Sequence, residues 1–315
     1  MIKIERYLNK NNFEWDNFID SSKNGVFFFK RNYMDYHSSR FIDHSLIFKD
    51  SDKIVAVLPS TENSNKLISH GGLTFGGIIS DFKMTTPLML NIFENLSKYS
   101  NDNNLESCIY KAIPHIYHTF PAEEDLYALY RIGARLIKRE VTTSIKNTNR
   151  INYQTRRIRS IDKAKKLGVI IKEAEKELEW EEYWELLSSV LLTRHKIAPV
   201  HTFAEINYLR KLFPENIKLF FSICNNRINS GVVLFIHKNN SHTQYLCSND
   251  EGQKNGCLDY VIDSVLHSNS MKTEFFDFGV STDDDGKLLN EGLINQKEGF
   301  GGRSIIHDSY EIKFK

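Results

Sequence analysis

Cysteine is scarce in this sequence, and its spacing carries no pattern. The 315 residues include only Cys108, Cys224, Cys247 and Cys257, and no two of them stand in a C-x-x-C arrangement. Isolated cysteines favour neither a disulfide scaffold nor a zinc site. We therefore expect reduced thiols, no metal, and no Cys–His nucleophile pair for covalent catalysis.

Long apolar runs and an excess of one charge are missing as well. No run approaches the roughly 18 apolar residues that a membrane-spanning helix needs, and the opening residues MIKIERYLNKNNFEW contain no apolar stretch of signal-peptide length. The 41 basic and 40 acidic residues give a net charge of +1, whereas a dedicated DNA-binding protein would be clearly basic. These absences predict a cytoplasmic protein without a membrane span and without DNA as a partner.

What is present is the composition of a globular protein, 41% hydrophobic and 12% aromatic. A chain of 315 residues is long for one core and suits two domains. Strand and helix patterns follow the same order in both halves, which indicates a duplication. We predict an α+β fold of two tandem domains, residues 1–150 and 151–315, each a mixed, mostly antiparallel sheet flanked by helices. The polar, basic stretch 149–168 would be a connecting helix.

The elements on which this prediction depends come from periodicity and from turn residues. They are a hairpin at 45–59, helices at 86–100, 123–133, 178–195, 202–213 and 257–268, and strands at 105–114, 169–174, 217–224, 230–238, 243–249, 273–279 and 309–314.

The stretch SHGGLTFGG, residues 69–77, has four glycines in nine positions. Glycine weakens a strand because it gives no side chain to pack, so we predict that a ligand approaches this bare backbone, with Gly72 and Thr74 on the substrate side. His70 is the first candidate for a general base, since imidazole titrates near neutral pH. The alternative is a structural histidine bonded to a neighbouring carbonyl group.

A second motif lies between the strand 243–249 and the helix 257–268. Gln253, Lys254, Asn255 and Gly256 form a Q-x-x-G just where the helix begins. Unpaired N–H groups at a helix N-terminus bind phosphates, and glycine lets the anion come close. The alternative is a plain polar turn.

This motif resembles the pyrophosphate loop of the GNAT acyltransferases, Q/R-x-x-G-x-G/A, although Leu258 stands at the last position. A broader resemblance connects the chain to FemAB-like proteins, which are tandem GNAT folds. It is carried by RNYMDYHSSRFIDHSL, SHGGLTFGG, AIPHIYHTFPAEEDLY, RRIRSIDKAKKLG and FFDFGVSTDDDGKLLNEGLINQKEGFGG, which together cover most of the chain. The resemblance implies two GNAT-like domains, with the acceptor on the N-terminal side and acyl-CoA as cosubstrate on the C-terminal side.

FemAB-like proteins include transfer-RNA-dependent enzymes of peptidoglycan and enzymes that acylate nucleotide-linked amino sugars. This chain has no long helical insertion and a balanced charge, which favours the second group. The resemblance implies transfer of an acetyl or 3-hydroxybutyryl group from acyl-CoA to a dTDP-linked 3-amino-3,6-dideoxyhexose, a sugar of the lipopolysaccharide O-antigen type, by direct attack. The alternatives are an aminoacyl-transfer-RNA-dependent transferase of the FemX type, with transfer RNA as its partner, and a non-catalytic binding protein.

Further roles follow from this chemistry. Asp277, inside the apolar strand 273–279, is the alternative candidate for the general base. Burying a carboxylate is costly, so it either has a catalytic role or is paired with another group. The resemblance places the oxyanion donor on a backbone N–H at Cys247 or Ser248. Lys297 and the glycine-rich run 299–302 would contact phosphate or close the site, unless the lysine is merely solvated.

Several residues of the N-terminal half suit a nucleotide. An aromatic-rich stretch could grip a diphosphate and stack on a base through Lys30, Tyr36, His37 and Arg40. The spacing alone slightly favours the alternative, an amphipathic helix with Tyr and Phe facing inward and Lys and Arg facing outward. His115 and His118 are three apart without a third ligand, which indicates a loop rather than a metal site.

A basic run indicates either a solvated helix face or contact with RNA. It consists of Arg156, Arg157, Arg159, Lys163, Lys165 and Lys166.

Overall fold

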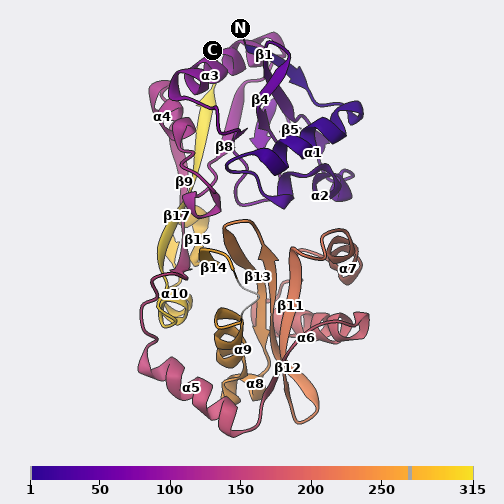
Figure 1. Cartoon of the computed structure of the whole chain (residues 1–315), viewed down its shortest axis with the longest axis vertical. Helices are drawn as coiled ribbons and strands as arrows, with labels where there is room; N and C mark the ends of the chain where they lie inside the picture. Colours follow the sequence, from indigo (N-terminus) through magenta and orange to yellow (C-terminus); the bar gives the residue numbers. More distant parts are fainter. Residues whose placement is uncertain (1, 269–271, 315) are drawn as a thin grey trace. The chain divides into compact units, whose positions relative to one another are not determined.

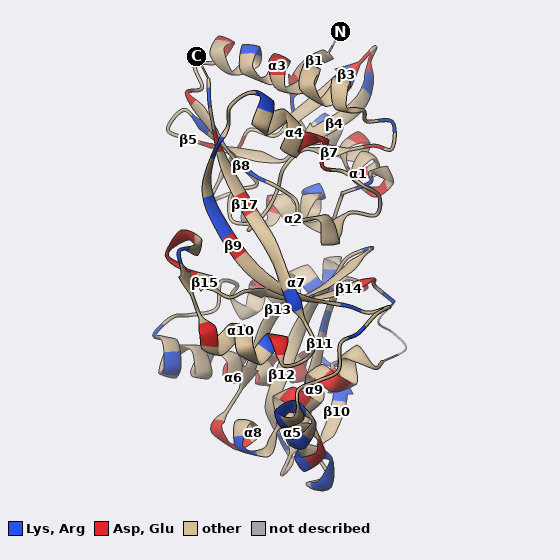
Figure 2. Ribbon diagram, turned by 90° about the vertical axis from the view of Figure 1, so that its left-hand side faces the viewer, with Lys and Arg blue, Asp and Glu red and all other residues tan. Residues whose placement is uncertain are grey.

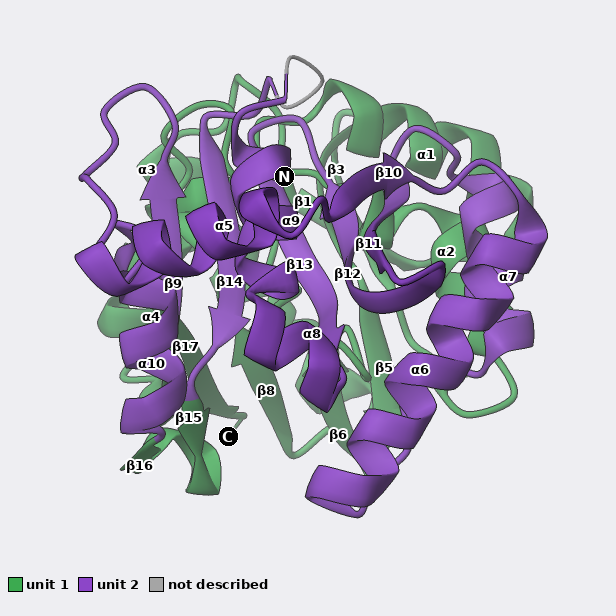
Figure 3. Ribbon diagram, turned by 90° about the horizontal axis from the view of Figure 1, so that it is seen from below, with its two compact units in different colours: residues 1–141, 282–289, 305–315 green, residues 142–281, 290–304 purple. Residues whose placement is uncertain are grey.

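The computed structural model describes residues 2–268 and 272–314. The chain divides into two compact units (Figure 3). Unit 1 comprises residues 1–141, 282–289 and 305–315, and unit 2 comprises residues 142–281 and 290–304. The predicted domains meet at a single point after residue 150, whereas the chain leaves unit 1 at residue 141 and returns to it twice.

Unit 1 contains two groups of hydrogen-bonded strands. The first is antiparallel and has the order β1 (Ile2–Arg6), β3 (Leu46–Asp50), β4 (Lys53–Leu58), β7 (Ile79–Ser80). The second has the order β17 (Arg303–Lys313), β8 (Ser107–Lys111), β6 (Lys66–Ser69), β5 (Ser60–Asn63), β2 (Ile42–Asp43), and only its β6–β8 pair is parallel. A two-stranded ribbon, β15 (Thr282–Asp283) and β16 (Leu288–Leu289), also belongs to this unit.

The helices of unit 1 (Figure 1) are α1 (Asn12–Ser21), α2 (Arg31–Met34), α3 (Thr86–Asp102) and α4 (Glu124–Arg131). Helix α3 shows why the sequence folds in this way. The Thr85 side chain accepts a hydrogen bond from the Leu88 N–H and so caps the helix start. Its apolar residues recur at helical spacing, and they bury one face in the core of unit 1, namely Met89, Ile92, Phe93 and Leu96.

Unit 2 is one mixed sheet with helices around it. The strand order is β10 (Ile170–Glu173), β11 (Ile217–Cys224), β12 (Arg227–Ile236), β13 (Asn240–Ser248), β14 (Phe275–Val280), β9 (Arg135–Lys146). All neighbours in this order are antiparallel except β13 and β14. The helices are α5 (Thr155–Lys166), α6 (Glu177–His195), α7 (Phe203–Leu212), α8 (Asp250–Asn255), α9 (Cys257–Leu266) and α10 (Glu291–Glu298).

The core of unit 2 joins the sheet to α9 and α5. Leu234 of β12 and Phe276 and Phe278 of β14 pack in one buried cluster with Val261 of α9 and Ile161 of α5. On the other face Tyr183 of α6 lies against Gly231, because a Cβ there would be 2.6 Å from the tyrosine ring. Helices therefore cover both faces of the strands β11 to β13.

The predicted fold class is confirmed: the chain is a mixed α+β protein whose mostly antiparallel sheets are flanked by helices. One local difference concerns residues 250–255, predicted as a loop and found as α8. The Asn249 side chain accepts a hydrogen bond from the Gly252 N–H, which caps this short helix. Among the described residues, no helix has both the length and the apolar character needed to cross a membrane.

Candidate functional site

The parallel strands β13 and β14 separate soon after they meet. They pair through only three residue pairs, the last of which joins His242 to Asp277. Beyond that point β13 remains paired with β12 as far as Ser248, and β14 pairs at Val280 with Thr142 of β9. The separation opens a gap within the sheet of unit 2, where backbone groups of both strands can meet a ligand.

Strand β13 carries an irregularity close to this gap. Val233 of β12 pairs with Tyr245, and the next residue, Leu234, pairs with Thr243, so Gln244 is an extra residue in β13. Such bulges bend a strand and re-aim its side chains, and they are frequent next to active sites.

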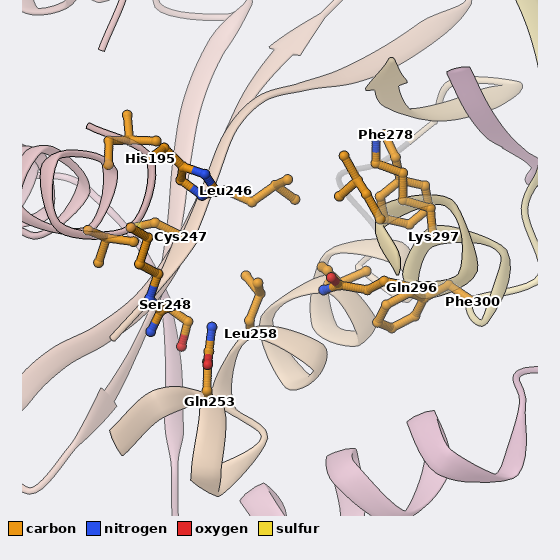
Figure 4. A pocket seen from close by; sticks show the side chains of 15 residues that line it. His195, Leu246, Cys247, Ser248, Gln253, Leu258, Phe278, Gln296, Lys297 and Phe300 are labelled. Carbon is orange, nitrogen blue, oxygen red and sulfur yellow. The ribbon is translucent and has the colours of Figure 1, made fainter. Parts of the chain in front are cut away.

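A pocket of about 200 Å³ occupies the region of the gap. Figure 4 shows His195, Cys247 and Ser248 on one side and Gln296, Lys297 and Phe300 on the other, with Gln253 and Leu258 between them. The remaining walls are mainly apolar and come from α6, β13, α9, β14 and α10: Val190, Leu191, Arg194, Leu246, Ile262, Phe278 and Leu293.

A second, more polar chamber of about 340 Å³ adjoins this pocket. The two chambers share Gln253, Leu258 and Gln296. The other residues that line the polar chamber are Arg156, Arg157, Ser160, Gly252, Gly256 and Asp259. The combined cavity suits a molecule with an apolar end and a polar end.

The Q-x-x-G motif lies at this second chamber, but α5 covers part of it. Gly256 has φ +74° and separates α8 from α9, and a Cβ there would lie 2.3 Å from the carbonyl oxygen of Ser160. Asp259 in the first turn of α9 accepts two hydrogen bonds from Arg157, at 2.6 and 2.7 Å. A carboxylate of the protein thus already lies at the positive end of the helix dipole.

The four residues of the motif have different surroundings. Gln253 lines both chambers and Gly256 lines the polar one. The carbonyl oxygen of Lys254 accepts a hydrogen bond from Lys163, and the Asn255 side chain donates to Cys224 Sγ. Neither Lys254 nor Asn255 lines either chamber.

Lys297 brings a charge to the wall of the apolar pocket. Only 4% of the residue is exposed, and its ammonium group donates to the carbonyl oxygens of Gly279 and Val280 at 2.7 Å and to Ser281 Oγ at 2.8 Å. Burial lowers the pKa of Lys297 to about 8, against the opposing effect of the Asp277 carboxylate. The amine is therefore still mostly protonated at neutral pH.

Cys247 and Ser248, at the end of β13, both line the pocket. Burial raises the pKa of the Cys247 thiol to about 12, so this cysteine does not supply a thiolate near neutral pH. Ser248 donates to the carbonyl oxygens of Asn229 and Asn249, each at 3.3 Å.

Asp277 is wholly buried and paired. Its carboxylate accepts a hydrogen bond from Thr142 Oγ1 and another from His242 Nδ1, the second at 2.6 Å. His242 was not singled out from the sequence, nor were His195 and Gln296. The pairing of His242 with Asp277 depends on the register of two strands that are far apart in the chain, which a single sequence does not reveal.

No family model and no curated protein matches this chain. Among solved structures, FemX is 10% identical with a TM-score of 0.68, covering 97% of this chain and 96% of that one. L-PGS from Bacillus licheniformis is 10% identical with a TM-score of 0.61, covering 91% and 93%. A tandem GNAT protein from the clavulanic acid biosynthesis pathway is 7% identical with a TM-score of 0.51, covering 100% and 99%.

The fold is that of tandem GNAT-like proteins. The similarity extends over nearly the whole chain, so both units of this GNAT-like fold are included. At these identities the likeness concerns the fold alone, and the chemistry has to be argued from the site.

In unit 1, His70 lies in a closed environment. It is 3% exposed, with Nε2 3.1 Å from the Phe28 carbonyl oxygen and Nδ1 3.2 Å from that of Gly71. Burial lowers its pKa to about 4, so the ring is neutral at pH 7 and accepts a proton poorly. His70 and His37 line a small pocket of about 30 Å³ within this unit.

The glycines of residues 69–77 make room for neighbouring side chains of the chain itself. A Cβ at Gly72 would lie 3.1 Å from the Phe41 ring, one at Gly76 would lie 2.4 Å from His70 Cβ, and one at Gly77 would lie 2.6 Å from the Tyr110 hydroxyl. Intramolecular packing thus accounts for the glycine content. Gly72 and Thr74 themselves remain exposed.

The aromatic-rich stretch of unit 1 folds as short helical turns, α2 and the 3₁₀ turn Asp35–His37. Tyr36 and His37 lie with ring centroids 3.9 Å apart, Lys30 pairs with Asp20 at 2.8 Å, and Arg40 is exposed. The buried cation of this region is Arg31, which lies over the Tyr7 ring and pairs with carboxylates of unit 1.

His115 begins a 3₁₀ turn that ends at Tyr117, and His118 Nε2 lies 3.0 Å from the carbonyl oxygen of Ile113. Within residues 2–268 and 272–314, no group of three or more histidine, cysteine, aspartate or glutamate side chains could hold a metal ion.

Proposed function

We propose that this chain is an N-acyltransferase that moves an acyl group from acyl-CoA to an amine by direct attack. The observation that carries the proposal is the gap between β13 and β14, with its apolar pocket and the adjoining polar chamber. The acyl group would occupy the apolar pocket, and the phosphates would lie near Arg156 in the polar chamber. Holding donor and acceptor together supplies much of the acceleration, because a thioester is already reactive.

Strand β13 would hold the reacting carbonyl group. One of its backbone N–H groups at the gap would donate to the oxyanion as it forms. The sequence resemblance suggests Cys247 or Ser248 for this donor, and both residues line the pocket. Lys297 also lines this pocket, and its positive charge would favour negative charge that develops nearby.

For the acceptor, the sequence resemblance favours a dTDP-linked 3-amino-3,6-dideoxyhexose that receives an acetyl or 3-hydroxybutyryl group in the cytoplasm. Unit 1 would bind this acceptor. The residues proposed for that role are Lys30, Tyr36, His37, Arg40, Gly72 and Thr74; of these, Arg40, Gly72 and Thr74 are exposed.

The donor site is tested by filling it. Leu258 lines both chambers, so Leu258→Trp should weaken acetyl-CoA binding at least tenfold in isothermal titration. The matched control is Leu192→Trp on α6, whose side chain is 63% exposed and which should leave binding unchanged. Wild-type protein that neither binds acetyl-CoA nor releases its thiol with amino-sugar acceptors would overturn the proposal.

A second candidate is aminoacyl-transfer-RNA-dependent transfer, which the basic surface of α5 favours. Figure 2 shows Lys and Arg along this helix, and Arg156, Arg159, Lys163, Lys165 and Lys166 are all exposed. Tight, salt-sensitive binding of charged transfer RNA, together with no affinity for CoA, would favour this candidate over the first.

A further inference from the structure

The pair of His242 and Asp277 stands at the point where β13 and β14 part. His242 and Asp277 are the last residues that pair across these strands, and the His242 Nδ1–H donates to the carboxylate at 2.6 Å. The other carboxylate oxygen accepts the Thr142 hydroxyl proton. Thr142 and His242 therefore fix the Asp277 carboxylate from two sides, and the carboxylate fixes the tautomer of the ring.

The second nitrogen of this ring is available. With the proton on Nδ1, Nε2 carries the lone pair, and within the described part of the chain it has no hydrogen-bond partner. The His242 side chain is 19% exposed, while Asp277 is fully buried. A held carboxylate behind an accessible imidazole is the arrangement that general bases use.

Gly279 leaves room for the His242 ring because it has no side chain. Its φ is +74°, and a Cβ there would lie 3.1 Å from His242 Cε1. The carbonyl oxygen of the same glycine accepts a hydrogen bond from Lys297, and Phe278, the residue before it, lines the apolar pocket. The His242 ring thus lies beside Gly279, the residue of β14 that follows the pocket-lining Phe278.

The charges around His242 come from three other elements. Asp277 lies on β14, Lys297 on α10, and His237 follows the end of β12. Burial lowers the pKa of His237 well below its usual range, with the nearby His242 acting in the same direction, so His237 is neutral at pH 7.

We propose that His242 is the catalytic base of the acyl transfer and that Asp277 is its positioning residue. The inference rests on the proposed function. His242 Nε2 takes a proton from the ammonium group of the acceptor. The free amine then attacks the thioester carbonyl carbon, the C–N bond forms and the C–S bond breaks. The thiolate leaves with the second N–H proton as the thiol, and His242 releases its proton to solvent.

The geometry of the pair is tested apart from activity. The Nδ1 proton of a histidine bonded to a carboxylate gives a far-downfield proton resonance in NMR spectra of the full chain. This resonance should be present in wild type and absent from His242→Gln and Asp277→Asn. The control is His267→Gln, which removes an exposed histidine paired with Asp263 and should leave the resonance in place.

The catalytic role is tested with acetyl-CoA and the dTDP-linked 3-amino-3,6-dideoxyhexose. At neutral pH, kcat of His242→Gln should fall at least about a hundredfold, with the KM for acetyl-CoA within about threefold of wild type. Asp277→Asn should lower kcat in the same direction. His267→Gln should keep full activity.

Three results would overturn the proposal, each in its own way. If the wild type lacks the resonance, His242 and Asp277 do not form the proposed hydrogen-bonded pair. If the wild type is active and the kcat of His242→Gln stays within threefold of it, His242 is not the catalytic base, while the proposed function stands. A wild type that shows the resonance but transfers no acyl group to any amine overturns the proposed function and, with it, this role.

Discussion

At the scale of single residues, the surroundings of a histidine decide what it can do. His70 stands in a glycine-rich stretch that suggests a ligand, yet it is closed in by the carbonyl groups of Phe28 and Gly71. His242 carries no sequence motif, yet its ring has one nitrogen held by Asp277 and one that is accessible. Residue type can be read from a sequence, whereas these contacts depend on strands that meet only in the fold.

We expect His70→Ala to affect stability rather than catalysis. Loss of the ring leaves a buried carbonyl group without its partner and opens space in unit 1, which should cost about 1 to 3 kcal/mol of unfolding free energy. Under the same conditions kcat should stay within threefold of wild type. Urea denaturation and steady-state assays of the same preparation measure both, and a tenfold loss of kcat with unchanged stability would restore His70 as the base.

Lys297 should make stability depend on alkaline pH. Its pKa falls from 10.5 to about 8 through burial. Between these values the unfolded chain holds a proton that the folded chain has released, so this residue makes unfolding less favourable as pH rises. Relative to Lys297→Met, wild type should gain about 1 to 3 kcal/mol from about pH 8 to pH 10.

This difference is measured by urea denaturation of the two proteins side by side, because other titrating groups then cancel. Lys83→Met, which alters an exposed lysine of unit 1, is the control and should follow wild type at every pH. A wild type that loses stability relative to Lys297→Met as pH rises would contradict the burial argument.

At the scale of elements, the contact between α5 and the start of α9 depends on Gly256. A Cβ there would meet the Ser160 carbonyl oxygen at 2.3 Å, and the positive φ alone costs a non-glycine residue roughly 1 to 2 kcal/mol. Gly256→Ala should therefore lower the free energy of unfolding by more than about 3 kcal/mol, since strain and a backbone clash add.

The matched control for Gly256→Ala is Gly133→Ala. Gly133 has a similar φ of +71°, but a Cβ there would find nothing within 4 Å. Its loss of unfolding free energy should be limited to the conformational cost, about 1 to 2 kcal/mol. If urea denaturation gives equal losses of unfolding free energy in the two variants, the contact between α5 and Gly256 adds nothing to the cost of Gly256→Ala.

Elements with strong periodicity were predictable, and short capped ones were not. The strand 243–249 and the helix 257–268 correspond to β13 and α9 within a few residues. The polar stretch DEGQKN reads as a loop because it has no apolar face, but the Asn249 cap makes it helical. The gap between β13 and β14 could not be predicted, because it arises from pairings with β12 and β9.

At the scale of the whole molecule, unit 1 needs a strand from the far end of the sequence. β17 pairs with β8 from Ser309 to Lys313, Ile312 belongs to the core of unit 1, and Asp308 binds Arg139 at 2.7 and 2.8 Å. A single boundary near residue 150 follows from reading two halves in order. Sequence patterns do not say which sheet a strand joins, so they do not predict the return of β17 to unit 1.

Residues 1–150 expressed alone should therefore not fold cooperatively. Appending residues 303–315 through a flexible linker should restore a two-state thermal transition, because β8 regains its partner and the core regains Ile312. The same fusion with Ile312→Asp should fail, since a charge would enter that core. Circular dichroism measures all three, and a cooperative transition in residues 1–150 alone would contradict this view.

The late position of β17 has a consequence for how the chain emerges from the ribosome. Residues 142–304 are synthesised after most of unit 1 but before residues 305–315. At about 5 to 20 residues per second, this interval amounts to roughly ten to thirty seconds. Throughout it the edge of β8 is open to strands of other nascent chains, so crowded polysomes and slow translation of the second half should favour co-translational aggregation.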